Sequence, residues 1–312
     1  MPPRIYPNLR HLMSLYEILI RQWSPGSGES VDDHVGGPDP GATSAVEALE
    51  TGRVLYLPAL RFQIEVHEEP LFTPVILRGA KNVSFDPATG RLGGTTLPGA
   101  PAETLKGLMR RFCTESAALV DRLLPVYRGH VRLARASFRP AEIAGRASSW
   151  RKDDSRLHVD SFPATPSGGQ RILRLFTNVN PSGRPRSWRI GEEFEAVAPR
   201  FAPRLRLPLP FSGQVLALLR LTKTRRTPYD ALMLQLHDAM KADDDFQRHS
   251  RQDAVDFPAG STWMAFTDQV GHAAMAGQYQ LEQTFLLPVR AMLDESRSPL
   301  RILERLKQRR LT

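Results

Sequence analysis

The chain has 312 residues, of which 41% are hydrophobic and 24% are charged, a composition typical of a soluble globular protein that can bury a sizeable core. A single cysteine, Cys113, excludes an intramolecular disulfide framework and any zinc site built from several cysteines. The net charge of +9 indicates an anionic partner, but it does not choose among nucleic acid, acidic lipid and an acidic small molecule. Since no run of about 18 apolar residues occurs and Glu17 and Arg21 interrupt the apolar N-terminal stretch, we expect neither a spanning helix nor a secretion signal, and a cytoplasmic protein.

Residues 1–44 form a region of their own in the sequence. Apolar side chains recur at helical spacing from Leu9 to Trp23, with charged residues on the rest of the wheel, so an amphipathic helix is expected at 8–23. Such a helix either packs on its own domain or lies on a bilayer surface. Residues 24–44 are rich in Gly, Ser, Pro and Asp and predict a flexible linker.

Residues 45–290 have the pattern of one compact domain. A short helix ending near Gly52 precedes a strand at 54–58, and the clearest helix covers 101–124, where Cys113 is expected to be a buried thiol. Another helix should run from Thr227, a capping residue followed by proline, to about Lys241. Short strands are predicted at 130–137, 156–162, 170–179, 187–194, 262–267 and 279–289. This order favours an α+β, mainly β fold with a double-sheet, jelly-roll core and flanking helices.

The segment with the most chemical information is 156–163. In a strand, alternate side chains share a face, so His158 and Asp160 are expected to point the same way. An imidazole and a carboxylate presented together supply two corners of a metal octahedron, and a second histidine would complete a facial triad with three open positions. Without that partner, the pattern is weak evidence.

The partner histidine is best sought in residues 257–272. A Pro-Ala-Gly turn precedes an aromatic-rich strand, and His272 is expected just past the end of that strand, beside Gly271. His237 is the competitor. It belongs to the predicted helix that begins near Thr227, with apolar neighbours at helical spacing, which favours a packed or surface histidine over a ligand.

At this point the sequence resembles a known family, the Kdo hydroxylases. The resemblance covers most of residues 45–290 and rests on the segments 52–58, 81–86, 157–163, 174–181, 272–279 and 281–285. It implies a double-stranded β-helix enzyme that depends on Fe(II) and 2-oxoglutarate, with ascorbate as a reductant in vitro, and that hydroxylates C3 of the sugar acid Kdo. The implied iron ligands are His158, Asp160 and His272, and no other catalytic residue is implied.

The resemblance also implies a substrate and a location. The substrate would be Kdo-lipid A or a related lipopolysaccharide precursor, and the enzyme would be peripheral on the cytoplasmic face of the inner membrane. Two arginines near the iron motif, Arg146 and Arg156, are the expected substrate-binding residues, although each is also compatible with a solvated surface. The tail 291–312 predicts a basic helix, which either contacts anionic lipid headgroups or packs on its own domain.

The residue that usually binds the distal carboxylate of 2-oxoglutarate differs in this sequence. Many 2-oxoglutarate oxygenases place a basic residue about eleven positions after the second histidine, where this chain has Gln283. A buried carboxylate without a partner is costly, so we expect Arg174 to replace that residue by gripping the carboxylate with two hydrogen bonds. A surface arginine is the alternative. Asn178 and Gln283 are expected to help orient the co-substrate.

Two other functions are compatible with parts of the sequence. A basic nucleic-acid-binding protein would explain the charge, but the chain has no recognisable reading motif and that function leaves the three ligands without a role; no nucleic acid is therefore expected as a partner. A metal-dependent cupin isomerase or epimerase would share the fold and two ligands but would need no 2-oxoglutarate.

Overall fold

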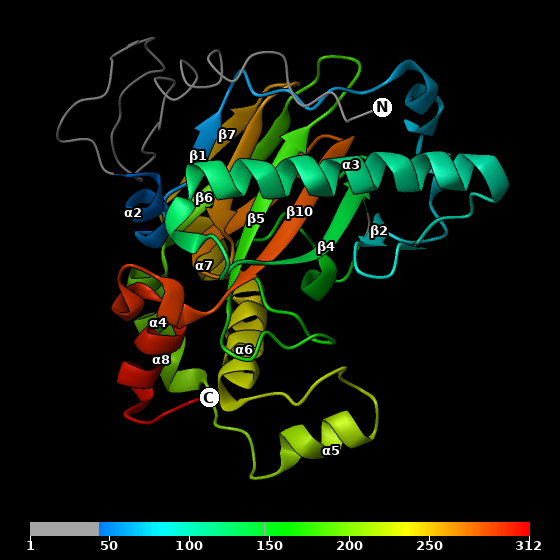
Figure 1. Ribbon diagram of the computed structural model, residues 1–312. Coiled ribbons are helices and arrows are strands. Elements are labelled where there is room, and N and C mark those ends of the chain that lie inside the picture. Colours follow the sequence, from blue (N-terminus) through cyan, green and yellow to red (C-terminus); the bar gives the residue numbers. More distant parts are fainter. Residues whose placement is uncertain (1–43, 147) are drawn as a thin grey trace.

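The computed structural model describes residues 44–312 except residue 147, and Figure 1 shows their arrangement. The expected helix at 8–23 and the linker up to residue 43 lie outside the described residues. Within the described part of the chain, no helix has the length and hydropathy that crossing a bilayer requires.

Two antiparallel sheets form the core of the protein. The larger has seven strands, in the order β1 (Leu55–Leu57), β8 (Thr262–Phe266), β5 (Arg171–Asn178), β10 (Gln280–Leu287), β4 (Arg132–Arg139), β2 (Val83–Asp86) and β3 (Arg91–Gly93). The smaller has three, in the order β7 (Gln252–Phe257), β6 (Arg186–Glu193) and β9 (Val270–Ala276). The double-sheet architecture with flanking helices confirms the mainly β, jelly-roll prediction.

Aromatic side chains fill the space between the two sheets. Phe257 of β7 stacks on Trp263 of β8 with ring centroids 4.0 Å apart, and Trp188 of β6 meets Phe176 of β5 edge-on at 4.9 Å. Such contacts contribute beyond the apolar area that they bury. Because side chains alternate along a strand, the face of β5 that carries Phe176 also carries Arg174 and points toward the small sheet, while Leu175 points to the opposite side.

The outer face of the large sheet is covered by α3 (Gly99–Leu123), as Figure 1 shows. The helix buries Leu105, Leu108, Met109 and Phe112 at helical spacing, and Cys113 among them is 3% exposed. The predicted helix at 101–124 and its buried thiol are both confirmed. Burial raises the pKa of Cys113 to about 12, so this thiol stays protonated and unreactive at neutral pH.

The other helices lie at the ends and below the sheets. Thr227 forms a capping box with Asp230 at the start of α6 (Pro228–Ala242), as expected. The remaining α-helices are α2 (Ala45–Glu50), α4 (Phe194–Phe201), α5 (Ser212–Leu218), α6 (Pro228–Ala242), α7 (Asp244–His249) and α8 (Pro299–Lys307). Short 3₁₀ helices are η1 (Val66–Leu71), η2 (Pro74–Ile76), η3 (Pro125–Tyr127), η4 (Trp150–Lys152), η5 (Ala202–Arg204), η6 (Val289–Ala291) and η7 (Glu295–Arg297).

One predicted strand is wrong. Residues 156–162 form no strand; a single bridge joins His158 to His272, with hydrogen bonds in both directions. The backbone of Leu157 bonds instead to the side chain of Gln247, and the Asp160 amide donates to the carbonyl of Thr267. One bridge and the side chain of Gln247 therefore supply hydrogen bonds to the backbone of this segment, and no strand ladder forms.

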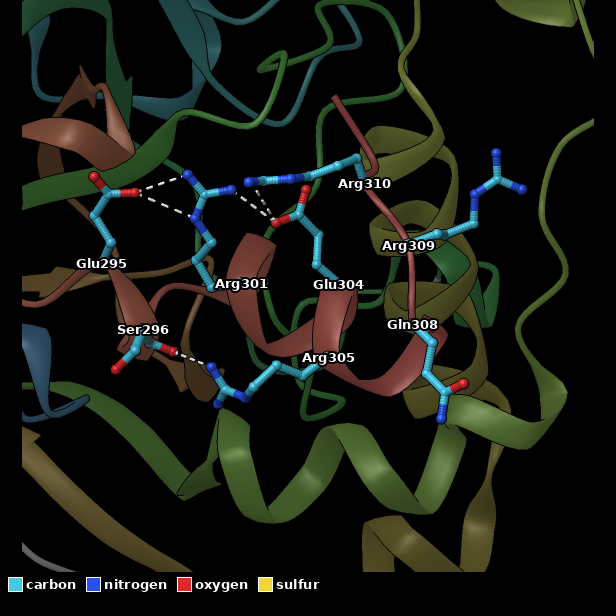
Figure 2. Close-up of a pocket in the computed structure, with 8 residues that line it drawn as sticks. All are labelled: Glu295, Ser296, Arg301, Glu304, Arg305, Gln308, Arg309 and Arg310. Atoms are coloured by element: carbon cyan, nitrogen blue, oxygen red, sulfur yellow. Dashed lines mark hydrogen bonds and ion pairs between the residues drawn. The ribbon is translucent and has the colours of Figure 1, made fainter.

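The C-terminal helix α8 packs on its own domain. Leu300, Ile302 and Leu303 are buried, so the apolar face of the helix is not available to lipid. Its arginines surround a surface hollow of about 610 Å³ (Figure 2), where Arg301 pairs with both Glu295 and Glu304. Of the two interpretations of the tail, packing on the domain is the correct one.

Candidate metal centre

Three side chains from distant parts of the sequence meet at the end of the small sheet. His158 and Asp160 come from the bridged segment after η4. His272 lies past the end of β8, as predicted, but it is the third residue of a further strand, β9, that was not predicted. One potential ligand atom from each of the three lies within 4.8 Å of the others. The two imidazole rings are 4.7 Å apart between centroids, and both are nearly buried.

Backbone carbonyls orient both imidazoles. Nδ1 of His158 is 2.7 Å from the carbonyl oxygen of Arg156, and Nδ1 of His272 is 2.8 Å from that of Val270. Since a carbonyl oxygen only accepts, each Nδ1 must carry the hydrogen, and each Nε2 keeps its lone pair for a metal. Partners of this kind fix the tautomer and the ring plane of metal-binding histidines.

The protonation states of the three groups suit metal binding. Burial, aided by neighbouring cationic groups, lowers the pKa of His158 well below its usual value, and burial also lowers the pKa of His272, so both rings are neutral at pH 7. Burial alone would raise the pKa of Asp160, but the guanidinium of Arg174 holds it well below its usual range. Two neutral imidazoles and one carboxylate are the donor set of a facial triad.

An unsatisfied oxygen indicates that the arrangement is incomplete without a cation. Oδ2 of Asp160 is buried and lies 3.2 Å from Nε of Arg174, but the two atoms are not aligned for a hydrogen bond and neither has another partner. Buried polar atoms are normally satisfied, and an exception calls for an unseen ligand or ion. The residues therefore fit a divalent metal.

Arg174 is part of a buried chain of charges that reaches from the metal cluster across the large sheet. Its Nη1 is 3.1 Å from Oε1 of Glu282 on β10, and Oε2 of Glu282 accepts a 3.0 Å hydrogen bond from Nε of Arg139 on β4. The alternative of a surface arginine is wrong, because the Arg174 side chain is only 12% exposed. Glu282 and Arg139 were missed, although Glu282 is two residues from Thr284, the register partner of Arg174.

Gln283 lies on the wrong side of the sheet for the predicted role. It pairs in register with Leu175, so its side chain shares the outer, apolar face with that leucine. Its amide donates to the carbonyls of Ala134 and Thr284. Because side chains alternate along β10, Gln283 points away from Arg174. The prediction that Gln283 orients the co-substrate is therefore wrong.

Asn178 shares the face of Arg174 but is fully engaged elsewhere. Its amide donates to the carbonyls of Arg184 and Phe257, and its oxygen accepts from the amide of Asn180. Four residues along a strand also separate it from Arg174 by about 13 Å. Asn178 therefore stabilises the turns at the end of β5, and its side chain is not available to contact the co-substrate.

The two predicted substrate arginines have different surroundings. Nη2 of Arg146 is 2.7 Å from Oδ2 of Asp154, which also pairs with Lys81 at 3.1 Å. These three side chains are about one quarter exposed and carry one net positive charge. Arg156 instead contacts Asp244 and the carbonyl of Lys241, so it ties the metal segment to α6 and α7 and does not share a strand face with His158.

His237 is closer to the cluster than the sequence indicated. Its ring packs edge-on against that of His158, with centroids 5.2 Å apart, and its Nδ1 is 2.9 Å from Asp238. It is a packed histidine, as predicted, and it does not belong to the group of three that can share a metal. A helix turn after it, buried Lys241 adds a cation that contributes to the low pKa of His158.

Comparisons with known proteins agree with this geometry. A family model described as 3-deoxy-D-manno-oct-2-ulosonic acid (Kdo) hydroxylase matches residues 37–310. Among solved structures, the Kdo hydroxylase KdoO, a non-heme Fe(II) alphaketoglutarate-dependent dioxygenase, in complex with cobalt(II) is 48% identical, with a TM-score of 0.84 over 86% of this chain and 90% of that one.

Two further KdoO structures give the same result. The complex with alphaketoglutarate and Fe(III) is 46% identical and the apo form 47% identical, each with a TM-score of 0.83 over the same shares of the two chains. The comparison with curated proteins gave no match. On the extent of the family match and of the structural similarity, this chain belongs to the Kdo hydroxylase family.

Proposed function

We propose that this chain is an Fe(II)- and 2-oxoglutarate-dependent dioxygenase that hydroxylates Kdo. The observation that carries the proposal is the convergence of His158, Asp160 and His272, with both Nε2 atoms free to bind a metal. Membership of a family whose solved members include a non-heme Fe(II) enzyme in complex with alphaketoglutarate supports the same metal and co-substrate here.

The charges around the cluster support a dianionic co-substrate. Asp160 and Glu282 are balanced by Arg174 and Arg139, while the two histidines are neutral. A divalent ion added to these four charges, with buried Lys241 also nearby, leaves at least two positive charges in a buried site, which is costly until an anion enters. 2-Oxoglutarate carries two negative charges, so it suits the metal-loaded site.

The residues of the chain divide the work around the metal. When bound, Fe(II) supplies the activation of dioxygen, coupled to oxidation of 2-oxoglutarate to succinate and carbon dioxide. His158, Asp160 and His272 hold the ion, and the backbone carbonyls of Arg156 and Val270 keep both imidazoles oriented. Arg174 keeps Asp160 ionised, and its guanidinium is the group that we propose receives the distal carboxylate of the co-substrate. The apolar packing between the sheets excludes water from one side of the site.

The proposed acceptor is Kdo within Kdo-lipid A or a related lipopolysaccharide precursor, hydroxylated at C3. Such a substrate carries carboxylate and phosphate groups, and the net positive group of Lys81, Arg146 and Asp154 is a partly open surface that suits them. Because that substrate is lipid-linked, the protein would act as a peripheral protein at the cytoplasmic face of the inner membrane.

A mass-spectrometric assay tests this function. Kdo-lipid A is incubated with the protein, Fe(II), ascorbate, dioxygen and 2-oxoglutarate, and the expected product has gained one oxygen atom on the Kdo residue with one succinate released per product. Omission of 2-oxoglutarate should abolish the product. An acceptor left unmodified while 2-oxoglutarate is still consumed would reject Kdo-lipid A as substrate; a modified acceptor without succinate release would reject the co-substrate.

A further inference from the structure

The segment 205–226, which we call the α5 arm, extends away from the sheets and their covering helices (Figure 1). Of thirteen large hydrophobic side chains that are exposed among the described residues, seven lie on the arm. They are Leu207, Leu209, Phe211, Val215, Leu218, Leu219 and Leu221. Leu209 is 80% exposed, Phe211 75% and Leu218 82%. A soluble protein seldom exposes so many large apolar side chains together unless they contact a partner or a membrane.

The arm is also strongly basic. It contains Arg206, Arg220, Lys223, Arg225 and Arg226, and no aspartate or glutamate occurs anywhere in residues 196–229. The first four of these cations are exposed, and no carboxylate in the described part of the chain pairs with them. By contrast, Arg204 just before the arm pairs with Asp243. Apolar side chains flanked by unpaired cations are the composition of segments that bind anionic lipid surfaces.

The arm is fixed to the domain at its two ends. Nζ of Lys307 donates to the carbonyls of Ala202 and Leu205, and the backbone of Arg206 exchanges two hydrogen bonds with the side chain of Gln235. At the other end, the amide of Lys223 donates to the carbonyl of Ala164 and Nη2 of Arg226 to that of Pro163.

These attachments place the arm next to the metal segment, since Pro163 and Ala164 follow the ligand Asp160 by three and four residues. The conformation of the arm also holds its apolar side chains outward. Phe211 adopts a left-handed backbone conformation with φ of 62°, which is unfavourable for a residue other than glycine. This unfavourable backbone conformation occurs at Phe211, whose ring is exposed to solvent.

We propose that the α5 arm docks on an anionic phospholipid bilayer, with Phe211, Leu218 and Leu219 in the interfacial region and its arginines and lysine on the headgroups. This inference rests on the proposed function in one respect, namely that a lipid-linked acceptor must be taken from a membrane. It assigns the membrane contact to a segment beside the metal cluster, and not to the C-terminal helix, whose apolar face is already buried.

Vesicle co-sedimentation of the full-length protein tests the docking without any Kdo or lipid A present. Vesicles of phosphatidylethanolamine and phosphatidylglycerol are expected to bind the protein, and vesicles of phosphatidylcholine alone to bind it at least about tenfold more weakly, because each cation near an anionic surface contributes about fivefold in affinity. The variant Phe211→Ser/Leu218→Ser/Leu219→Ser should bind the anionic vesicles at least about tenfold more weakly than the wild type.

A matched control distinguishes this contact from nonspecific binding by exposed apolar side chains. Val66 and Val75 are as exposed as Leu209 and Leu218 but lie outside the arm, so Val66→Ser/Val75→Ser should bind vesicles as the wild type does. Wild-type binding by the arm variant, or equal loss in both variants, would overturn the proposal. If sedimentation velocity instead shows a dimer that only the arm variant dissolves, with vesicle binding unchanged, the arm is a contact between copies of the chain and the lipid assignment is wrong.

A fluorescent probe reports the depth of the arm directly. Cys113 is buried, so a maleimide dye sensitive to polarity should label only the new thiol of Leu218→Cys or of the control Val66→Cys. Anionic vesicles should shift the emission of the first to shorter wavelength and leave the second unchanged; an unshifted Leu218→Cys probe would contradict insertion.

The outcome is distinguishable from that of the proposed function. Hydroxylation of detergent-solubilised Kdo-lipid A by the arm variant at the wild-type rate, with loss of activity only on vesicle-borne substrate, supports the docking. Vesicle binding by a protein that hydroxylates no Kdo would uphold the docking and reject the function.

Discussion

Two groups of arginines in this protein are paired with glutamates, one beside the metal cluster and one around the hollow at α8 (Figure 2), and they differ in burial. Beside the metal, the side chains of Arg174 and Glu282 are 12% and 4% exposed. At α8, Arg301 is 29% exposed and Arg305 50%, and Glu195, the partner of Arg305, is 67% exposed. An arginine–glutamate pair is therefore expected to affect stability differently in the two places.

Solvent accounts for the difference. An exposed ion pair contributes little to stability, since water screens it and two long side chains must be ordered. A buried pair is no more stabilising than apolar side chains of the same volume, but removal of one member leaves an uncompensated charge. The stability of the fold therefore depends on each residue of the buried pairs. These pairs lie where the metal and its co-substrate would bind.

The largest effect is expected from loss of a metal ligand. We predict that His272→Ala reduces succinate release at least about a thousandfold, because the chemistry depends on the bound ion, and that it leaves the fold intact by circular dichroism. Iron content measured after dialysis should fall to background. The control His237→Ala removes an imidazole that packs against His158 but lies outside the group of three, and it should retain iron. Equal iron loss in both variants would mean that the ligand set has been misassigned.

Arg174→Ala should have the next largest effect. Removal of the guanidinium takes away the cation that we propose receives the distal carboxylate, so KM for 2-oxoglutarate should rise about a hundredfold, as for truncation of a buried charge pair. Steady-state kinetics measure this rise. Arg174→Lys keeps the charge and should show a smaller one.

Gln283→Met is the matched control for the opposite face of the same sheet. It should leave KM for 2-oxoglutarate unchanged within about twofold, because Gln283 faces away from the cluster and its amide serves only backbone carbonyls. A large increase in this variant, with none in Arg174→Ala, would place the co-substrate on the other face of the large sheet.

Glu282→Gln tests the buried chain of charges through stability. It leaves Arg139 and Arg174 with one carboxylate fewer in a buried environment, and we expect a loss of about 3 kcal/mol in the free energy of unfolding. Urea denaturation measures the loss. Added metal and 2-oxoglutarate should restore part of it, because ligands that bind only the folded state stabilise it. No loss of stability would show that solvent reaches these charges.

The sequence predicted the parts of this arrangement that depend on local pattern. Helical spacing predicted α3, and the capping residues around Thr227 predicted the start of α6. The three residues that could hold a metal were recognisable from residue types together with the family resemblance. Strand parity across the sheet was not predictable, because it depends on the register between β10 and β5; that register puts Glu282 on the face of Arg174 and turns Gln283 away. The strand predicted at 156–162 was wrong for a related reason. The backbone partners of this segment include the side chain of Gln247, about 90 residues later in the chain.

The smallest effect is expected at α8, and it completes the contrast between the two arginine groups. Arg305→Ala removes the pair with Glu195 and a hydrogen bond to the carbonyl of Ser296. Because both charged side chains are at least half exposed, we expect at most about 1 kcal/mol in the free energy of unfolding, and less at high salt. Turnover and the 2-oxoglutarate requirement should be those of the wild type. A loss as large as that of Glu282→Gln would mean that solvent does not screen the Arg305–Glu195 pair, and burial would then no longer separate the two groups of charges.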